Sequence, residues 1–274
     1  MSLRGVCLAA GARILLSDVD LSVRAGEFVA VVGPNGVGKS TLLRSIAGFA
    51  RPLAGTIEID GSDSGALSAH ERAQRISLLG SDGEVPAGLS LREVAVTGRF
   101  ARRPWWDWTR SDEDLRIAGA ALERVDLGTA GERDFASLSS GERQRAWIAL
   151  ALAQEASTLL LDEPTSHLDA RYALDILGLL RSLARGSTSV VAVLHDLNEA
   201  AAFADRVALL GEGRVLAYER PERALDPELL GRAYGVTFVR VAIEGEPRVF
   251  ARAINPPRRQ EGTLSDWQRA RHDR

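Results

Sequence analysis

Cysteine and long apolar segments are both scarce in this sequence of 274 residues. The single cysteine, Cys7, excludes an intrachain disulfide and a CxxC metal or redox site, and such sparse usage is typical of a reducing cytoplasm. Apolar runs such as Val190–Leu194 are far shorter than the ~20 residues that span a bilayer. The first residues show neither a long apolar segment nor a small-residue cleavage site, so a secretory signal is not expected. We therefore expect a protein that stays in the cytoplasm.

A strong excess of charge of one sign is also missing, because the formal net charge is -3. Proteins whose main partner is DNA or RNA usually carry a basic surface. We therefore expect no nucleic-acid partner. The hydrophobic fraction of 45% and the charged fraction of 26% match an ordinary globular protein, and the length allows a substantial core.

Short apolar or β-branched runs alternate with helical patterns along much of the chain. This alternation predicts an α/β fold with a mostly parallel sheet. We expect strands buried on both faces at Glu27–Val32, Thr56–Ile59, Thr158–Leu161, Ser189–Leu194 and Arg206–Leu210. We expect helices at Ser40–Ala50, Arg143–Glu155, Ala170–Ala184 and Asn198–Ala204.

Two regions depart from this alternation. Residues from about 90 to 155 contain helical patterns and few strand candidates, which predicts a helical subdomain inserted in the sheet. Residues 256–274 begin with Pro256 and Pro257 and continue with a polar, arginine-rich sequence, which predicts a flexible tail.

A glycine-rich segment follows the strand expected to end at Val32 and precedes a helical pattern. That context favours a phosphate-binding loop over a turn that matches by chance. Glycines let the backbone N–H groups surround a phosphate, and the helix adds its positive N-terminal end. Lys39 would then bind the terminal phosphates and Ser40 would ligate Mg²⁺. The segment fits the pattern G-x-x-x-x-G-K-[ST] and continues into Thr41, with the sequence Gly33-Pro34-Asn35-Gly36-Val37-Gly38-Lys39-Ser40-Thr41.

Two carboxylates, Asp162 and Glu163, follow the expected strand Thr158–Leu161. Open α/β sheets bind ligands at the carboxyl ends of their strands. Asp162 could hold the Mg²⁺ shell, and Glu163 could accept a proton from an attacking water. Such a pair alone is more often a helix cap or a solvated turn, but beside a phosphate loop the functional interpretation is favoured.

A third motif, Leu138-Ser139-Ser140-Gly141-Glu142, stands at the start of a helical pattern and is a good N-cap as local structure. It lies between the phosphate loop and the Asp162-Glu163 pair, and His195 follows downstream. This order of motifs resembles that of ABC ATPases, over about Leu3–Asp226. The resemblance implies an ABC-type P-loop NTPase with ATP and Mg²⁺ as cofactors. Its fold would have a mostly parallel core, an inserted helical subdomain at about 90–155 and an N-terminal antiparallel β region, all within residues 1–255.

The resemblance also implies that two copies of the chain pair head to tail. Ser139, Ser140 and Gly141 of one copy would contact the ATP held by the other. The segment Ser166–Asp169 resembles the loop that joins the two sites, so that Asp169 would contact nucleotide. His195 matches a histidine that senses the γ-phosphate, although a lone histidine at a strand end is usually structural.

Two positions depart from the family pattern. Ser81 stands where most members have a glutamine that meets Mg²⁺ and the water. A serine is shorter and lacks the amide, so a metal contact there would be weaker or water-mediated. The segment Leu8–Arg13 lacks the aromatic residue that commonly stacks on adenine, so base stacking would be weak or supplied differently.

Within the family, the chain resembles the ATPases of importers for iron-siderophore complexes, haem and cobalamin. The cues are the segments Val85–Val94, Leu194–Asn198 and Leu229–Val236. This resemblance implies a peripheral subunit on the cytoplasmic face of the membrane that works beneath permease subunits and, indirectly, with an extracytoplasmic substrate-binding protein. An exporter ATPase subunit and a soluble, non-transport ABC ATPase remain alternatives. The tryptophan-rich segment Arg102–Trp108 either packs within the helical subdomain or forms a surface near the permease.

Overall fold

The computed structural model describes residues 1–80, 88–104, 106, 109, 111–186 and 188–252. Four features named above lie wholly or partly outside these residues: Ser81, residues 85–87 of the segment Val85–Val94, Trp105 and Trp108 of the segment Arg102–Trp108, and the tail predicted at 256–274.

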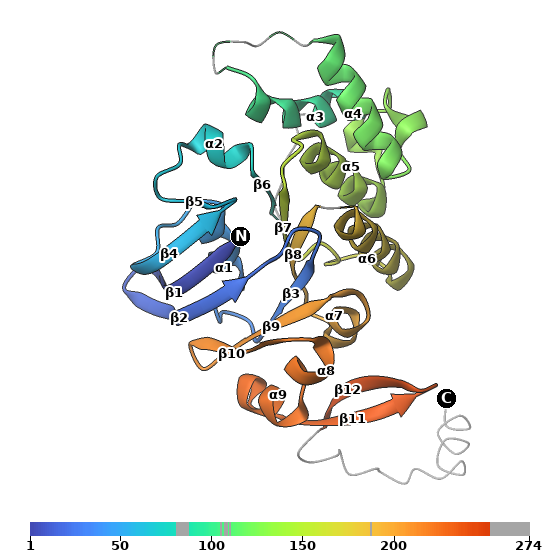
Figure 1. The fold of residues 1–274 in the computed structure, drawn as a ribbon. Coiled ribbons are helices and arrows are strands. Elements are labelled where there is room, and N and C mark those ends of the chain that lie inside the picture. Colours follow the sequence, from blue (N-terminus) through green and yellow to red (C-terminus); the bar gives the residue numbers. More distant parts are fainter. Residues whose placement is uncertain (81–87, 105, 107–108, 110, 187, 253–274) are drawn as a thin grey trace, which may run out of the picture.

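A six-stranded sheet forms the centre of the described structure, in the order β10-β9-β3-β8-β7-β6 (Figure 1). Its neighbouring strands run parallel, except that the edge strand β10 is antiparallel to β9. Every residue of β3 and β8 is buried, which explains why both strands read as continuous apolar runs. The predicted α/β fold with a mostly parallel sheet is confirmed. The strands are β3 (Phe28–Val32), β6 (Ile76–Leu79), β7 (Thr158–Asp162), β8 (Ser189–Val193), β9 (Arg206–Gly211) and β10 (Arg214–Glu219).

The predicted location of the strand at Thr56–Ile59 is wrong. The strand exists, but it belongs to a separate antiparallel sheet near the N-terminus, in the order β2-β1-β4-β5. Only Ile57 and Ile59 of β4 are buried, because the strand has one face on the core and the other toward solvent. The strands of this sheet are β1 (Ser2–Ala10), β2 (Arg13–Ser22), β4 (Ala54–Ile59) and β5 (Ser62–Asp63).

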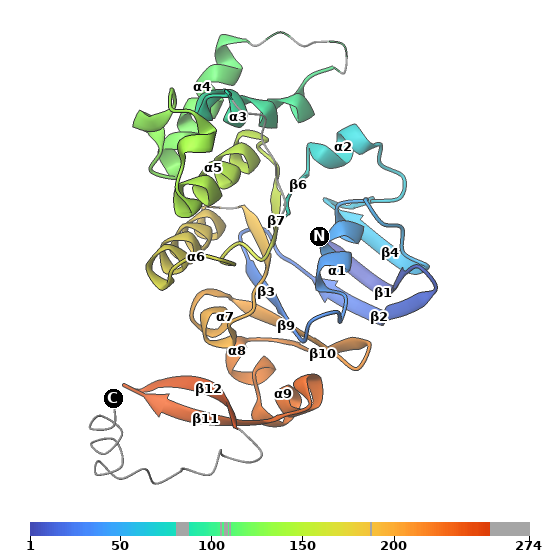
Figure 2. The same cartoon turned by 180° about the vertical axis from the view of Figure 1, so that it is seen from behind.

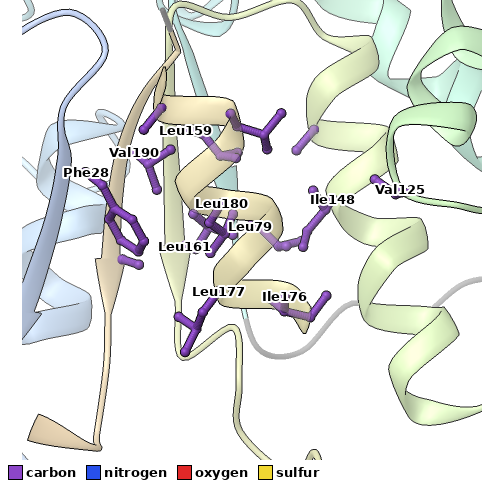
Figure 3. Close-up of a cluster of buried hydrophobic side chains, with 14 of the residues drawn as sticks. Phe28, Leu79, Val125, Ile148, Leu159, Leu161, Ile176, Leu177, Leu180 and Val190 are labelled. Carbon is purple, nitrogen blue, oxygen red and sulfur yellow. The ribbon is translucent and has the colours of Figure 1, made fainter. Parts of the chain in front are cut away.

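Helix α1 (Lys39–Ile46) packs between the two sheets, and its side chains Leu42, Leu43 and Ile46 share one apolar cluster with both. The helix is shorter than the predicted range of Ser40–Ala50, because Gly48 turns the chain with a φ of 82°. A second cluster fills the opposite face of the central sheet, where α6 (Ala170–Arg185) covers β7 and β8. Figure 3 shows Leu177 and Leu180 of α6 in this layer. Each such buried leucine contributes ~1.5–3 kcal/mol.

The helical subdomain predicted between β6 and β7 is confirmed, and it lies at the top of Figure 1. Its three longer helices each begin at a serine that accepts a hydrogen bond from the backbone N–H three residues on, while the carboxylate of that residue reaches back. Such a capping box satisfies two N–H groups that would otherwise lack partners. These helices are α3 (Leu91–Thr97), α4 (Asp112–Arg124) and α5 (Ser140–Ala153), with 3-10 turns η1 (Gly98–Arg102), η2 (Gly128–Ala130) and η3 (Phe135–Ser137). The short helix α2 (Ala69–Ala73) precedes β6.

The C-terminal part of the described chain folds back onto the central domain (Figure 2). The helix predicted at Asn198–Ala204 is present as α7, whereas the sequence analysis predicts no elements for α8, α9 and the hairpin that follows them. After β9 and β10, two short helices lead to a two-stranded hairpin that turns at Glu244–Gly245. No described helix is both long and apolar enough to cross a bilayer. The elements are α7 (Leu197–Phe203), α8 (Pro221–Ala224), α9 (Pro227–Tyr234), β11 (Thr237–Ile243) and β12 (Glu246–Arg252).

Candidate functional site

The predicted phosphate loop joins the end of β3 to the start of α1. Gly33, Gly36 and Gly38 have φ angles of 151°, 75° and 114°, a range in which residues with a side chain are strained. The loop therefore reaches a conformation that depends on glycine. The N-terminus of α1 follows directly, so its positive end faces the loop region as anion-binding sites require.

Gly33 also packs directly against β9. A Cβ atom at Gly33 would lie 2.5 Å from the carbonyl oxygen of Leu210. We expect Gly33→Ala to push the loop away from β9 and to lower the affinity for ATP about 10-fold, since strain of this kind costs ~1–3 kcal/mol. Titration with a fluorescent ATP analogue measures the effect.

Gly36→Ala is the matched control, because a Cβ atom there would meet nothing within 4 Å and adds only the strain of its positive φ. We expect a smaller loss of affinity for Gly36→Ala than for Gly33→Ala. Equal affinities in the two variants would contradict the importance of the contact with Leu210.

Lys39 lies at the start of α1 with its side chain buried under the loop. Its Nζ donates hydrogen bonds to the carbonyl oxygens of Gly33 at 2.7 Å and Pro34 at 3.1 Å. Burial lowers the pKa of Lys39, and the nearby carboxylates of Glu163 and Asp162 oppose this shift. Lys39 is also the chain's only lysine. The amine is therefore held in place by backbone contacts at the position where phosphate charge would be neutralised.

Ser40 and Asp162 come together from two different elements. The Ser40 hydroxyl at the start of α1 donates to Asp162 Oδ1 at the end of β7, with a separation of 3.0 Å. A hydroxyl and a carboxylate are the hard oxygen donors that Mg²⁺ prefers, and Mg²⁺ commonly binds one or two carboxylates together with substrate phosphates. The described residues contain no group of three or more acidic, histidine or cysteine side chains that could hold a metal alone. The donor set therefore fits Mg²⁺ bound jointly with phosphate.

Glu163 lies beside His195 at the carboxyl edge of the sheet. His195 Nε2 is 2.7 Å from Glu163 Oε1, and the Ser166 hydroxyl donates to Glu163 Oε2 at 3.0 Å. Burial alone would raise the pKa of Glu163, but the hydrogen bonds from His195 and Ser166 and the charge of Lys39 outweigh it, so the pKa is lowered. The carboxylate is therefore ionised at neutral pH and able to accept a proton. Glu163 also has a φ of 55°, and strained backbone of this kind concentrates at functional sites.

A cavity of about 420 Å³ collects most of the residues predicted for nucleotide binding and catalysis. Gly33, Pro34 and Asp162 do not line it, but they are hydrogen-bonded to the lining residues Lys39 and Ser40. The cavity is lined by Leu15, Asn35, Gly36, Gly38, Lys39, Ser40, Thr41, Glu163 and His195.

The other predicted site residues that the structure describes do not line this cavity. Ser139 caps α5, Ser140 is exposed beside it, and Gly141 is buried under the ring of Tyr172. Asp169 stands at the N-cap of α6, yet its exposed side chain makes no capping hydrogen bond. Within one chain, these groups are therefore separate from the phosphate loop.

Leu15 is a residue of the cavity that the sequence interpretation missed. It lies on β2 and provides the apolar part of a wall that otherwise consists of polar loop residues. The missing aromatic residue at Leu8–Arg13 indicated that base stacking is weak or supplied differently, without pointing to Leu15. An aliphatic residue in a strand carries no mark that distinguishes a ligand contact from ordinary packing.

The described residues of the segment Arg102–Trp108 include one that packs within the helical subdomain and one that is exposed at the surface. Arg103 is buried and pairs with Asp114 of α4, as expected for packing within the subdomain. The side chain of Trp106 is 66% exposed, as expected for a surface.

The family model and the relatives that match this chain all belong to ABC transport systems. A family model described as "ABC transporter" matches residues 16–166, which is more than half of the chain. The hemin import ATP-binding protein HmuV of Rhodococcus jostii is 42% identical over 84% of this chain and 78% of the relative. The ferric enterobactin transport ATP-binding protein FepC of Escherichia coli is 36% identical over 86% of this chain and 87% of the relative.

Two solved structures of ABC transporter proteins also match this chain. An inward-facing metal-chelate type ABC transporter matches with a TM-score of 0.79 and 27% identity, over 91% of this chain and 95% of that one. A dimeric bacterial ABC transporter cassette, MJ0796, matches with a TM-score of 0.69 and 30% identity, over 80% of this chain and 98% of that one. With a phosphate loop, an adjoining Asp-Glu pair and a histidine assembled at one edge of an α/β sheet, and with these relatives, the chain belongs to the ABC transporter family.

Proposed function

We propose that this chain binds ATP with Mg²⁺ and hydrolyses it as the ATP-binding subunit of a membrane importer for haem, a ferric siderophore or a related metal chelate. The observation that carries the ATPase part is the single cavity that gathers Lys39, Ser40, Glu163 and His195. The importer part is supported by relatives that match most of the chain, a hemin import and a ferric enterobactin transport ATP-binding protein.

In this proposal, the chain's own groups have separate tasks. Lys39 and the backbone of the phosphate loop hold the terminal phosphates, and Ser40 and Asp162 hold Mg²⁺, which neutralises phosphate charge when bound. Glu163 accepts the proton of the water that attacks the γ-phosphorus while the bond to the β,γ-bridging oxygen breaks. His195 stands beside Glu163 and contacts the γ-phosphate. Ser81, outside the described residues, remains a proposed indirect contact to the metal.

We further propose that a second copy of the chain completes the site. Ser139, Ser140 and Gly141 would contact the ATP held by the partner copy, and Asp169 would reach the same interface. Two observations support this arrangement: these residues lie away from their own chain's cavity, and a dimeric cassette is among the matching structures.

A single added charge tests the pairing. Ser140 is exposed at the start of α5, where a glutamate is favourable for the helix. In a Glu163→Gln background, which keeps ATP bound, we expect Ser140→Glu to abolish ATP-dependent dimerisation because its carboxylate would face the partner's phosphates. Light scattering with and without ATP measures the dimer.

Ala120→Glu adds the same charge on the exposed surface of α4 and is expected to dimerise normally. If Ser140→Glu dimerises as well as Ala120→Glu, the proposed contact across the pair is wrong.

The proposed setting is the cytoplasmic face of the membrane, where residues 1–255 form one ATPase domain beneath permease subunits. A substrate-binding protein outside the membrane would deliver the cargo. Purification of the tagged chain from detergent-solubilised membranes, followed by mass spectrometry, tests the setting. Co-purification of a polytopic permease and a substrate-binding protein supports an importer, whereas a permease without a binding protein supports an exporter. Recovery with soluble assemblies alone would overturn the transporter assignment and leave the ATPase proposal in place.

A further inference from the structure

The C-terminal hairpin is joined to the segment that carries His195. Asn198, three residues after His195, pairs with the backbone of Val249 on β12. The Val249 N–H donates to Asn198 Oδ1 at 2.9 Å, and Asn198 Nδ2 donates to the Val249 carbonyl oxygen at 3.2 Å. The Asn198 amide thus makes the two backbone hydrogen bonds that a neighbouring strand would make at this residue of β12. Both hydrogen bonds are partly buried, and 51 residues separate the two partners.

The first turn of α7 is tied to the reaction centre on its other side. Asp196 caps the helix by accepting from the N–H groups of Asn198 and Glu199. Glu199 accepts from the Thr165 hydroxyl at 3.3 Å, and Thr165 is two residues after Glu163. His195 itself contacts Glu163 at 2.7 Å. A shift of this turn would therefore move His195 relative to Glu163.

The hairpin β11–β12 has contacts with α8 and α9 that are independent of Asn198. Arg240 of β11 donates to the carbonyl oxygens of Glu222 in α8 and of Leu225, directly after α8. The ring of Phe238 packs on Tyr234 of α9 with a centroid distance of 5.6 Å. These contacts do not involve α7, so the hairpin keeps its attachment when the bonds to Asn198 are removed.

The same C-terminal region reaches the phosphate loop. Burial raises the pKa of Tyr234 to about 12, against the effect of a hydrogen bond from the Gly33 backbone. The end of α9 thus meets the first glycine of the loop, while β12 meets the turn after His195. Both contacts come from residues beyond the matched family region at 16–166.

We propose that Asn198 is a positioning residue, through which the hairpin β11–β12 holds the first turn of α7 and so places His195 for hydrolysis. This inference rests on the proposed role of His195 in ATP turnover. Asn198 contacts neither phosphate nor water in this proposal. It acts by restricting where the histidine can be.

A double-mutant cycle on the full-length chain tests the proposal. Asn198→Ala is expected to lower kcat for ATP about 10-fold with little change in KM, because small misplacements of a catalytic group cost one to two orders of magnitude in rate. In the His195→Ala background, the same change is expected to have no further effect on kcat. Val249→Pro removes the N–H donor from the other side and is expected to reproduce the loss.

Val241→Thr is the control, since Val241 lies on the hairpin with its side chain 45% exposed. It is expected to leave kcat and KM unchanged, and thermal unfolding of each variant shows whether the fold is retained. Equal fractional losses from Asn198→Ala in the wild-type and His195→Ala backgrounds would overturn the positioning role, as would an unchanged kcat in Asn198→Ala. Full activity in His195→Ala alone would instead overturn the proposed role of His195, and the positioning inference with it.

Discussion

Glu163→Gln is expected to lower the rate of ATP hydrolysis by a factor of about 10² to 10⁴ while ATP binding is retained, the usual range for loss of a general base. The amide keeps the size of the side chain and its proximity to His195 but accepts a proton poorly. Hydrogen bonds lower the pKa of Glu163, so the wild-type carboxylate is already ionised and ready to accept a proton. The substitution removes this proton acceptor. Phosphate release and equilibrium ATP binding, measured side by side, separate chemistry from affinity.

Glu123→Gln makes the same chemical change at an exposed position of α4 and is expected to hydrolyse ATP at the wild-type rate. A Glu163→Gln protein within a few-fold of Glu123→Gln would show that another group takes the proton. Loss of ATP binding together with turnover would indicate that Glu163 supports the loop and is not specific to the chemical step.

Asp114→Asn is expected to destabilise the protein by about 3–5 kcal/mol, the cost of leaving buried charge without its partner. Asp114 accepts hydrogen bonds from Arg99 and Arg103, and all three side chains are buried in the helical subdomain. Burial alone would raise the pKa of Asp114, but hydrogen bonds from Ser111, Arg99 and Arg103 lower it to about 2. Urea-induced unfolding followed by circular dichroism measures the loss.

Asp112→Asn is the matched control, because Asp112 is exposed on the same first turn of α4. The pH dependence gives a second check. A carboxyl whose pKa is lower in the folded state stabilises the fold at pH values above its unfolded pKa, and this stabilisation is lost as pH falls through the folded pKa. The difference in stability between wild type and Asp114→Asn should therefore be full above about pH 4 and shrink toward pH 2. A difference that is independent of pH in this range would contradict the charge-based explanation.

The phosphate loop and the Asp162-Glu163 pair could be predicted because their signals are local. In both cases a buried strand is followed at once by the motif, and the Asp162-Glu163 pair was favoured as functional because a phosphate loop accompanies it. The central strands β3, β7, β8 and β9 were predicted for the same reason, since strands buried on both faces read as unbroken apolar runs, whereas β6 and β10 were not among the predicted strands. At β4 the short window Thr56–Ile59 was misread, because two isoleucines separated by one residue fit either a one-faced or a two-faced strand.

The C-terminal hairpin shows why other parts could not be predicted. Its apolar residues Val241 and Ile243 are about half exposed, so the spacing of apolar residues in this segment does not predict which side of the hairpin is buried. The side chain that completes the edge of β12 is Asn198, far away in sequence, and a polar residue early in a helix gives no sign of a distant backbone partner. Long-range pairing of this kind depends on the folded chain as a whole.

The solitary lysine gives the protein an unusual reactivity toward reagents that modify primary amines. Positive charge elsewhere in the chain is carried by arginine, so the targets for acylation are Lys39 and the N-terminal amine. Lys39 is only 6% exposed beneath the phosphate loop. Acylation followed by mass spectrometry of the peptides that contain Lys39 and the N-terminus would therefore measure the fraction of molecules whose loop is shielded, without any engineered label.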